Sequence, residues 1–246
     1  MLTALADGRL LAEKTGSLPP AVVALHGWQR TGTDFTPILA GLDAVAPNLP
    51  GASTAAEPPT EAWGSPEYAE LVADAIRPFG PVILVAHSFG GRVAVHLAAK
   101  YPDLVRGLVL TGVPLVRLQA APKASLGFRV LKRLASLGLV SKQRLEAERR
   151  KRGSADYNAA QGIVREIFVK VVNEDYDAPM AALTVPVRMV WGEHDTSAPT
   201  DAGRVASERI PGAVFRVVPG AAHLLEGDLR TAVREELDIL IEETRP

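Results

Sequence analysis

The hydrophobic positions of the chain fall into short runs of two kinds. Strand-like runs lie at residues 21–27, 43–51, 81–88, 107–114, 185–192 and 213–220, and several of them are continuously apolar, as is typical of strands buried on both faces of a sheet. Segments with helical periodicity lie between them, at 65–78, 90–101, 200–209 and 225–243. This alternation predicts an α/β fold with a mostly parallel sheet.

The N-terminal residues show a different pattern. The stretch "ALADGRLLAEKTG" places Asp7 and Gly8 between two short apolar runs. An Asp-Gly pair favours the tight turn of a hairpin, so we expect two antiparallel strands at one edge of the sheet.

Residues 115–182 interrupt the alternation of strands and helices. They contain no strand-like run and appear as consecutive helical segments at 124–140, 141–153 and 154–176. A block of this length is too long for a simple crossover between neighbouring strands. We therefore expect a core formed by residues 1–114 and 183–246, with residues 115–182 inserted into it as a helical cap.

Composition narrows the class of protein. The chain has 246 residues, 47% of them hydrophobic, which suffices for one large domain or a domain with an insertion. It has no cysteine, which excludes disulfides, thiolate metal ligands and thiol nucleophiles.

Charge and hydropathy bear on partners and location. The net charge of −1 gives no reason to expect nucleic acid as a partner. The sequence has neither a signal-peptide pattern at its start nor the ~20 apolar residues in a row that span a bilayer. We expect a cytoplasmic protein that acts on a small molecule without stable membrane association, and its oligomeric state stays open.

The stretch "AHSFGG" at 86–91 follows one strand-like run and precedes a helical one. Small residues two positions before and after Ser88, Ala86 and Gly90, permit a sharp turn that displays the hydroxyl above the sheet. The helix that follows would direct its N–H groups and its positive dipole end toward the serine. Ser88 is either a nucleophile or an ordinary residue at a strand end, and the motif alone does not decide.

A serine nucleophile needs a base, for which histidine is suited by its pKa of about 6.5. His223 is the best candidate, because it lies in a loop after the last strand and before the final helix. His96 lies within a helix at a position consistent with packing. His87 is adjacent to Ser88, and we expect its side chain to point away.

The base in turn needs an acid that fixes its tautomer and stabilises its charged form. Asp195, in "WGEHDTSAP", follows the run at 185–192 and is the preferred candidate over its neighbours Glu193 and Asp201.

An oxyanion hole requires backbone N–H groups directed at the charge that develops during acyl transfer. We expect one from Phe89, the residue after the serine, and one from Trp28, in the loop after the run at 21–27. The alternative is that both residues only pack, and the predicted role leaves their side chains free to do so.

Taken together, "LHGW" (25–28), "NLPG" (48–51), "AHSFGG" (86–91), "WGEHDTSAP" (191–199) and "PGAAH" (219–223) resemble the α/β-hydrolase superfamily. The resemblance implies an eight-stranded, mostly parallel sheet with helices on both faces and a helical cap after the sixth strand. It implies Ser88, Asp195 and His223 as a triad in the family's chain order. Two departures are Ala86, where glycine is frequent, and Asn48, where aspartate is usual.

The resemblance also implies a reaction class. A serine at the elbow argues against the dehalogenases and epoxide hydrolases of this fold, which use aspartate there. It implies a serine hydrolase that cleaves a small-molecule carboxylic ester or related acyl compound through an acyl-enzyme, with no metal or organic cofactor. Two alternatives stay open: hydrolysis of a carbon–carbon bond in a vinylogous diketone, and a non-catalytic small-molecule receptor.

Residues 115–152 carry eleven Lys/Arg against two Glu, a formal charge of +9. This segment could attract an anionic substrate, but a solvated surface is the favoured interpretation, with Leu131, Leu134 and Leu137 forming a buried stripe. Residues 153–160 and 171–176 are polar enough to border a site, although the sequence gives them no definite role.

Overall fold

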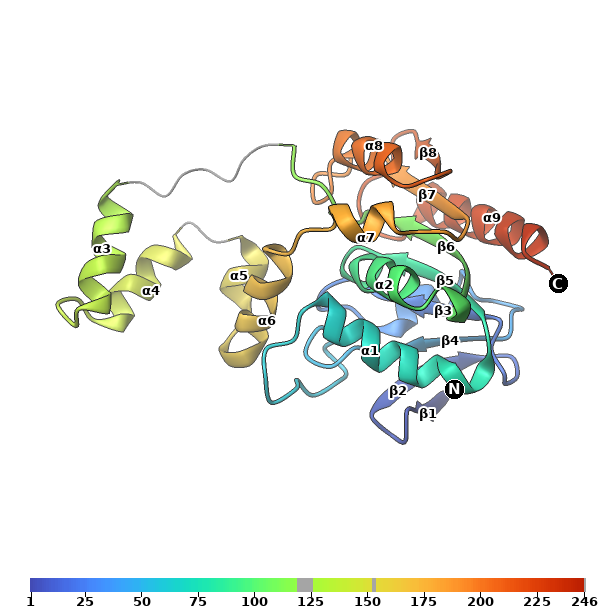
Figure 1. Ribbon diagram of the computed structural model, residues 1–246, viewed down its shortest axis with the longest axis horizontal. Coiled ribbons are helices and arrows are strands. Elements are labelled where there is room, and N and C mark those ends of the chain that lie inside the picture. Colours follow the sequence, from blue (N-terminus) through green and yellow to red (C-terminus); the bar gives the residue numbers. More distant parts are fainter. Residues whose placement is uncertain (119–125, 152–153, 246) are drawn as a thin grey trace.

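The computed structural model describes residues 1–118, 126–151 and 154–245, and its centre is an eight-stranded sheet (Figure 1). The strands are β1 (Leu2–Leu5), β2 (Leu10–Thr15), β3 (Val22–Leu25), β4 (Ala44–Pro47), β5 (Val82–His87), β6 (Val105–Thr111), β7 (Val187–Gly192) and β8 (Val214–Val218). Their order is β1-β2-β4-β3-β5-β6-β7-β8. Strands β3 to β8 are parallel, while β2 is antiparallel to both of its neighbours.

The hairpin predicted at the sheet edge is confirmed. Leu5 pairs with Leu10 at its closed end, and the turn passes through Ala6, Asp7 and Gly8 at φ of 50°, 55° and 87°. Glycine and aspartate tolerate this left-handed backbone better than other residues do, which explains why the Asp-Gly pair marks the turn.

Helices cover both faces of the sheet: α1 (Ser65–Ile76), α2 (Phe89–Lys100), α8 (Thr200–Arg209) and α9 (Gly227–Glu243). Short 3-10 helices lie at Gly32–Phe35, Arg77–Phe79 and Pro102–Leu104. Alternate residues of β5 pack into different clusters: Leu84 joins the cluster that contains α1 and α2, whereas Ile83 joins the one that contains α9. Because both sides of each central strand are buried, the strands are apolar throughout rather than alternating.

Between β6 and β7, the described residues form five helices: α3 (Leu126–Ser136), α4 (Lys142–Arg150), α5 (Ala155–Ala159), α6 (Gly162–Val172) and α7 (Asp177–Ala181). Helix α3 packs against α4, and α7 packs against α2 and α8. In Figure 1, α3 and α4 stand apart from the sheet, while α7 lies beside α2. The division into a core and a cap of residues 115–182 stays a prediction.

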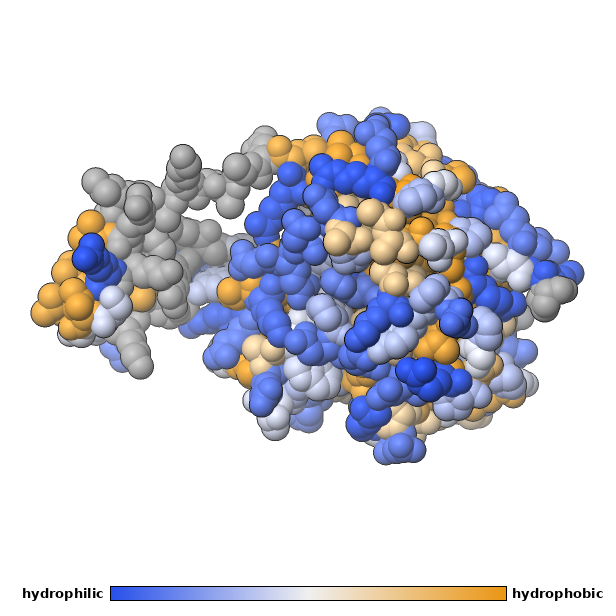
Figure 2. Space-filling model, in the orientation of Figure 1, coloured by the Kyte–Doolittle hydropathy of each residue, from blue (hydrophilic) through white to orange (hydrophobic). Residues whose placement is uncertain are grey.

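The stripe predicted on α3 is wrong at one position. Leu131 and Leu134 are partly buried, but Leu137 is 65% exposed. Helix α3 ends at Ser136, so Leu137 lies in the turn beyond it and no longer follows the helical periodicity. Figure 2 shows hydrophobic residues at this outer end of the molecule, where Leu139 is also exposed.

The basic residues of 115–152 whose side chains are described in full lie on the surface, in line with a solvated face: Arg117, Arg133, Arg144, Arg150 and Lys151. Within the described ranges, no helix has the length and hydropathy needed to cross a bilayer.

Candidate active site

Ser88 lies at a sharp turn between β5 and α2. Its backbone has φ 50° and ψ −114°, a region that L-residues rarely occupy. The turn is held on both sides: the Ser88 N–H donates to the carbonyl of Thr111 at 3.0 Å, and its carbonyl accepts from the Gly91 N–H at 3.1 Å. A strained backbone persists only where the surroundings fix it, and such residues concentrate at functional sites.

The residues beside Ser88 are small because the chain is crowded there. A Cβ on Gly90 would lie 2.2 Å from the Leu25 carbonyl oxygen, and one on Gly91 would lie 2.1 Å from a methyl group of Val113. Ala86, where the family often has glycine, is fully buried in β5. The turn therefore accepts one additional methyl group at Ala86 but none at the two glycines.

Asp195 and His223 meet above the ends of β7 and β8. The Asp195 Oδ2 lies 2.7 Å from the His223 Nδ1, and the Asp195 side chain is 1% exposed. Its other oxygen, Oδ1, accepts the N–H groups of Ser197 at 2.9 Å and Ala198 at 2.7 Å. These three bonds fix the carboxylate, and through it the orientation of the imidazole ring.

The competing candidates lie elsewhere. Glu193 is exposed and accepts the Gly220 N–H at 2.9 Å, while Asp201 is exposed on the first turn of α8. His96 packs against the ring of Tyr176 at 5.3 Å, as its helical position predicts. Of the acids and bases weighed from the sequence, the structure pairs Asp195 with His223.

Gly112, directly after β6, is a site residue that the sequence analysis missed. Its φ is +58°, and a Cβ built on it would lie 2.9 Å from the His223 Nδ1 and 3.1 Å from the Asp195 Oδ2. Only glycine leaves room for the paired side chains at this distance. A glycine at the carboxyl end of a central strand, in "LTGVP", is the signal that could have identified it.

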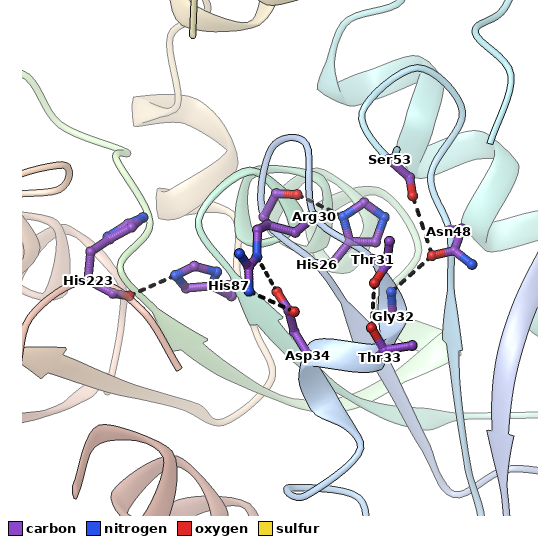
Figure 3. A network of polar contacts seen from close by, with 11 residues as sticks. His26, Arg30, Thr31, Gly32, Thr33, Asp34, Asn48, Ser53, His87 and His223 are labelled. Carbon is purple, nitrogen blue, oxygen red and sulfur yellow. Dashed lines mark hydrogen bonds and ion pairs between the residues drawn. The ribbon is translucent and has the colours of Figure 1, made fainter. Parts of the chain in front are cut away.

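His87 contradicts the expectation that its side chain points away. Its Nε2 donates to the backbone carbonyl of His223 at 2.9 Å, and the two rings lie 4.7 Å apart (Figure 3). Burial, together with the neighbouring His223, lowers the pKa of His87 to about 4, so the ring is neutral at pH 7. His87 is still a paired residue of β5, and its contact depends on the distant loop that carries His223, which strand alternation alone does not predict.

The loop after β3 carries Trp28 to the same place. His26 anchors this loop: its Nδ1 donates to the Gly27 carbonyl at 2.7 Å, and its Nε2 accepts the Leu49 N–H at 2.9 Å. Burial lowers the pKa of His26 to about 4, consistent with a neutral ring that donates from one nitrogen and accepts at the other. Asn48 is also structural, since its Oδ1 accepts the Gly32 N–H at 2.9 Å (Figure 3).

A cavity of about 630 Å³ joins these elements, and Ser88, His223, Trp28 and Phe89 all line it. In the part of the chain that the structure describes, no acceptor is paired with the backbone N–H of Trp28 or Phe89. The remaining wall includes residues from 153–160 and 171–176: Ser154, Asp156, Val171 and Val172. The Trp28 ring packs against Phe89 and against Phe168 of α6, at 5.6 and 5.3 Å.

Cofactor and metal sites were not expected from the sequence. The residues described contain no group of three or more His, Cys, Asp or Glu side chains placed to hold a metal ion.

The fold agrees with a comparison to known families. The sequence model of the alpha/beta hydrolase family matches residues 22–235, which is most of the chain. The chain therefore belongs to the alpha/beta hydrolase family, as the sequence motifs indicated.

The curated relatives and solved structures that the chain resembles include hydrolases of this fold. It is 28% identical over 245 residues to a pimeloyl-[acyl-carrier protein] methyl ester esterase of Chromobacterium violaceum, covering 89% of this chain and 94% of that protein. A shorter match, 35% identical over 96 residues, covers 37% of this chain and 34% of a 2-(acetamidomethylene)succinate hydrolase of Mesorhizobium japonicum. An esterase of Thermogutta terrifontis has the same fold, with TM-score 0.67, 19% identity and full coverage of both chains.

Proposed function

We propose that the protein is a serine hydrolase that cleaves a small-molecule carboxylic ester or related acyl compound through an acyl-enzyme. The observation that carries the proposal is that Ser88 and His223 line one cavity. Ser88 lies on a turn with positive φ, and His223 is paired with the buried Asp195 at 2.7 Å. A positioned serine, a base and an acid that orients the base are the elements of nucleophilic acyl transfer.

The hydrogen bond between Asp195 and His223 defines the direction of proton transfer. A carboxylate only accepts, so the His223 Nδ1 carries a proton and its Nε2 is free to accept one. In the proposed reaction, Ser88 Oγ forms a bond to the carbonyl carbon while its proton passes to Nε2. The carbonyl π electrons move to the oxygen, and the N–H groups of Trp28 and Phe89 stabilise the resulting charge.

The tetrahedral intermediate then loses its alcohol. The carbon–oxygen bond to the leaving group breaks, and the proton on His223 Nε2 is transferred to the departing oxygen, which leaves an acyl ester on Ser88. Water repeats the sequence with His223 as base, releasing the carboxylic acid and restoring the serine. Asp195 stabilises the imidazolium that forms in each half-reaction.

We further propose that residues 115–182 form the cap over this site. Helix α6 supplies Phe168, Val171 and Val172 to the cavity, and the residue that caps α5, Ser154, also lines it. Apolar walls around a small number of polar groups are typical of small-molecule sites. The acyl part of the substrate would lie against these walls.

The relatives support an ester as the bond cleaved. One is named for hydrolysis of a methyl ester, and the match to it runs over nearly the whole of both chains. The identity of the acyl group does not follow from this likeness, because the fold accommodates many substrates.

A substrate screen with a matched variant tests the proposal. Purified protein and Ser88→Ala are assayed against methyl and nitrophenyl esters of graded chain length, thioesters and a vinylogous dienone. We expect hydrolysis of at least one ester class, lowered about 10³-fold or more in the variant. Turnover of the dienone alone would favour the carbon–carbon hydrolase, and ligand binding with no turnover would favour the receptor. Full activity of Ser88→Ala would overturn the mechanism.

A further inference from the structure

Arg92 lies on α2, one helical turn beyond Ser88, and lines the same cavity. It is 8% exposed, which is unusual for a side chain that is charged at every physiological pH. It is not one of the cations of residues 115–152, and the sequence analysis did not single it out. The signal in the sequence was a basic residue four positions after the serine, within residues 89–95, which are otherwise small or apolar.

The guanidinium of Arg92 has neutral partners. Its Nη1 donates to the Val171 carbonyl at 2.7 Å, its Nη2 donates to the Pro114 carbonyl at 2.9 Å, and its charge lies over the Tyr176 ring at 5.3 Å. Its Nε is buried, and no residue of the described ranges supplies an acceptor to it. A guanidinium has five N–H bonds, and two of them are used here.

No carboxylate in the described ranges forms an ion pair with Arg92. The other arginine of the cavity, Arg30, differs: its Nε and Nη2 donate to the two oxygens of Asp34 at 2.6 and 2.8 Å (Figure 3). A buried charge without a counter-charge is costly, and a bound anion would offset that cost. Of the two arginines that line the cavity within the described ranges, Arg30 is neutralised by Asp34, whereas Arg92 has no ion-pair partner there.

We propose that Arg92 is the anion-binding residue of the cavity and receives a carboxylate of the substrate. Along α2, Arg92 lies about 6 Å from Ser88, from four residues at 1.5 Å each. A carboxylate on Arg92 therefore lies a few bonds from the ester carbonyl that Ser88 attacks. The substrate class is a short ester that carries a second, ionised carboxyl group, and this inference rests on the proposed hydrolase function.

The test compares esters that differ only in charge. The monomethyl esters of succinate, glutarate and adipate carry a carboxylate, and methyl esters of fatty acids with the same number of chain carbons do not. We expect the native protein to prefer the charged member of at least one pair by about 10-fold or more in kcat/KM. In Arg92→Gln we expect this preference to be lost, mainly because KM for the charged ester rises. The rise should be roughly 10- to 100-fold, which is what a charge-assisted hydrogen bond contributes to binding. Arg92→Lys keeps the charge without the planar fork and retains part of the preference.

Two controls make the result specific. Arg30→Gln removes a cation that Asp34 already neutralises, so the ratio between charged and neutral esters should stay within about threefold of the native ratio. Because Arg92 also holds Val171 and Pro114, a purely structural role would lower the turnover of both esters equally. Equal losses, or a native protein without charge preference, would overturn the proposal.

The outcome is separable from the proposed hydrolase function. Calorimetric titration of glutarate, which holds no ester, reports binding at Arg92 without any turnover: we expect binding to the native protein and to Ser88→Ala, and at least about 10-fold weaker binding to Arg92→Gln. If Ser88 reacts with a fluorophosphonate but the protein shows no preference for charged esters, only the role of Arg92 is disproved. If the protein binds glutarate but Ser88 does not react with the fluorophosphonate, only the hydrolase mechanism is disproved.

Discussion

Two regions of the molecule meet at the cavity and are built differently. The strand-end rim consists of the loops after β3, β5, β6, β7 and β8, and holds Trp28, Ser88, Gly112, Asp195 and His223. The helical segment, residues 115–182, contributes the walls from α5 and α6. In the rim, Ser88 and Gly112 have positive φ, and Gly112 leaves no room for a Cβ beside the His223 ring, whereas α3 and α4 pack against each other as ordinary helices.

The difference bears on the proposed function, because it separates the residues proposed to react from the helices proposed to contact the substrate. Close contacts such as that of Gly112 with the His223 ring allow one residue type, so the rim can hold reacting groups to within fractions of an ångström. Helices joined to the sheet through longer connections can change their side chains without loss of the fold. We therefore expect large effects from substitutions in the rim and small ones from the outer helical segment.

The largest effect is expected at the Asp195–His223 pair. Asp195→Asn leaves the shape but favours the wrong tautomer of His223, and we expect kcat for esters to fall on the order of 10³- to 10⁴-fold. Steady-state kinetics on the best ester of the screen measures it. Glu193→Gln, two residues away and exposed, is the matched control and should keep activity within about threefold. A loss below about 10-fold in Asp195→Asn would remove Asp195 from the mechanism.

Acid should destabilise the rim. Burial lowers the pKa of both His26 and His87 from 6.5 to about 4, so between these values the unfolded chain binds protons that the folded protein does not. The stability that the neutral rings provide is complete above pH 6.5 and is lost as pH falls toward 4, by about 1.4 kcal/mol for each pKa unit.

Urea unfolding at pH 7.0, 5.5 and 4.5 measures this loss. His87→Gln keeps a donor for the His223 carbonyl but does not titrate. As the pH is lowered, its free energy of unfolding should therefore fall less steeply than that of the native protein. Equal slopes in the two proteins would show that His87 binds protons as readily in the folded protein as in the unfolded chain, so that burial does not lower its pKa.

Gly112→Ala tests the close packing of the rim. The added Cβ must displace the His223 ring, so we expect kcat to fall by about 10- to 100-fold, together with about 1–2 kcal/mol of stability lost to the left-handed backbone. Gly41 also has positive φ, +77°, but has nothing within 4 Å of a built Cβ. Gly41→Ala should therefore lose similar stability and keep its activity. Equal activity in the two variants would mean that the His223 ring tolerates the methyl group.

The smallest effect is expected in the helical segment. Leu137 is 65% exposed, so Leu137→Ser should change the free energy of unfolding by less than about 0.5 kcal/mol, measured in urea. A loss above 1.5 kcal/mol, roughly, would indicate that Leu137 is buried in solution, as the periodicity of the sequence first suggested.

Elements and residues could be predicted from the sequence where burial, turn geometry or chemistry restricts the residue type. The strands were predicted because burial on both faces makes them continuously apolar, and the edge hairpin because Asp7-Gly8 suits its turn. Asp195 and His223 were predicted from their places after strands, and the structure brings them together. His87 and Gly112 were missed because their roles depend on a left-handed turn and on a contact between distant loops. The prediction that Leu137 is buried was wrong because periodicity does not mark the residue at which a helix ends.

Labelling by a fluorophosphonate tests the central claim most directly. The reagent forms a covalent bond only with a serine that is activated as a nucleophile, so intact mass and peptide mapping of the folded protein report on the site without knowledge of the substrate. We predict one adduct per chain, on Ser88, and none on folded Ser88→Ala. Folded native protein that forms no adduct, or forms it at another residue, would contradict the assignment of Ser88 as the nucleophile.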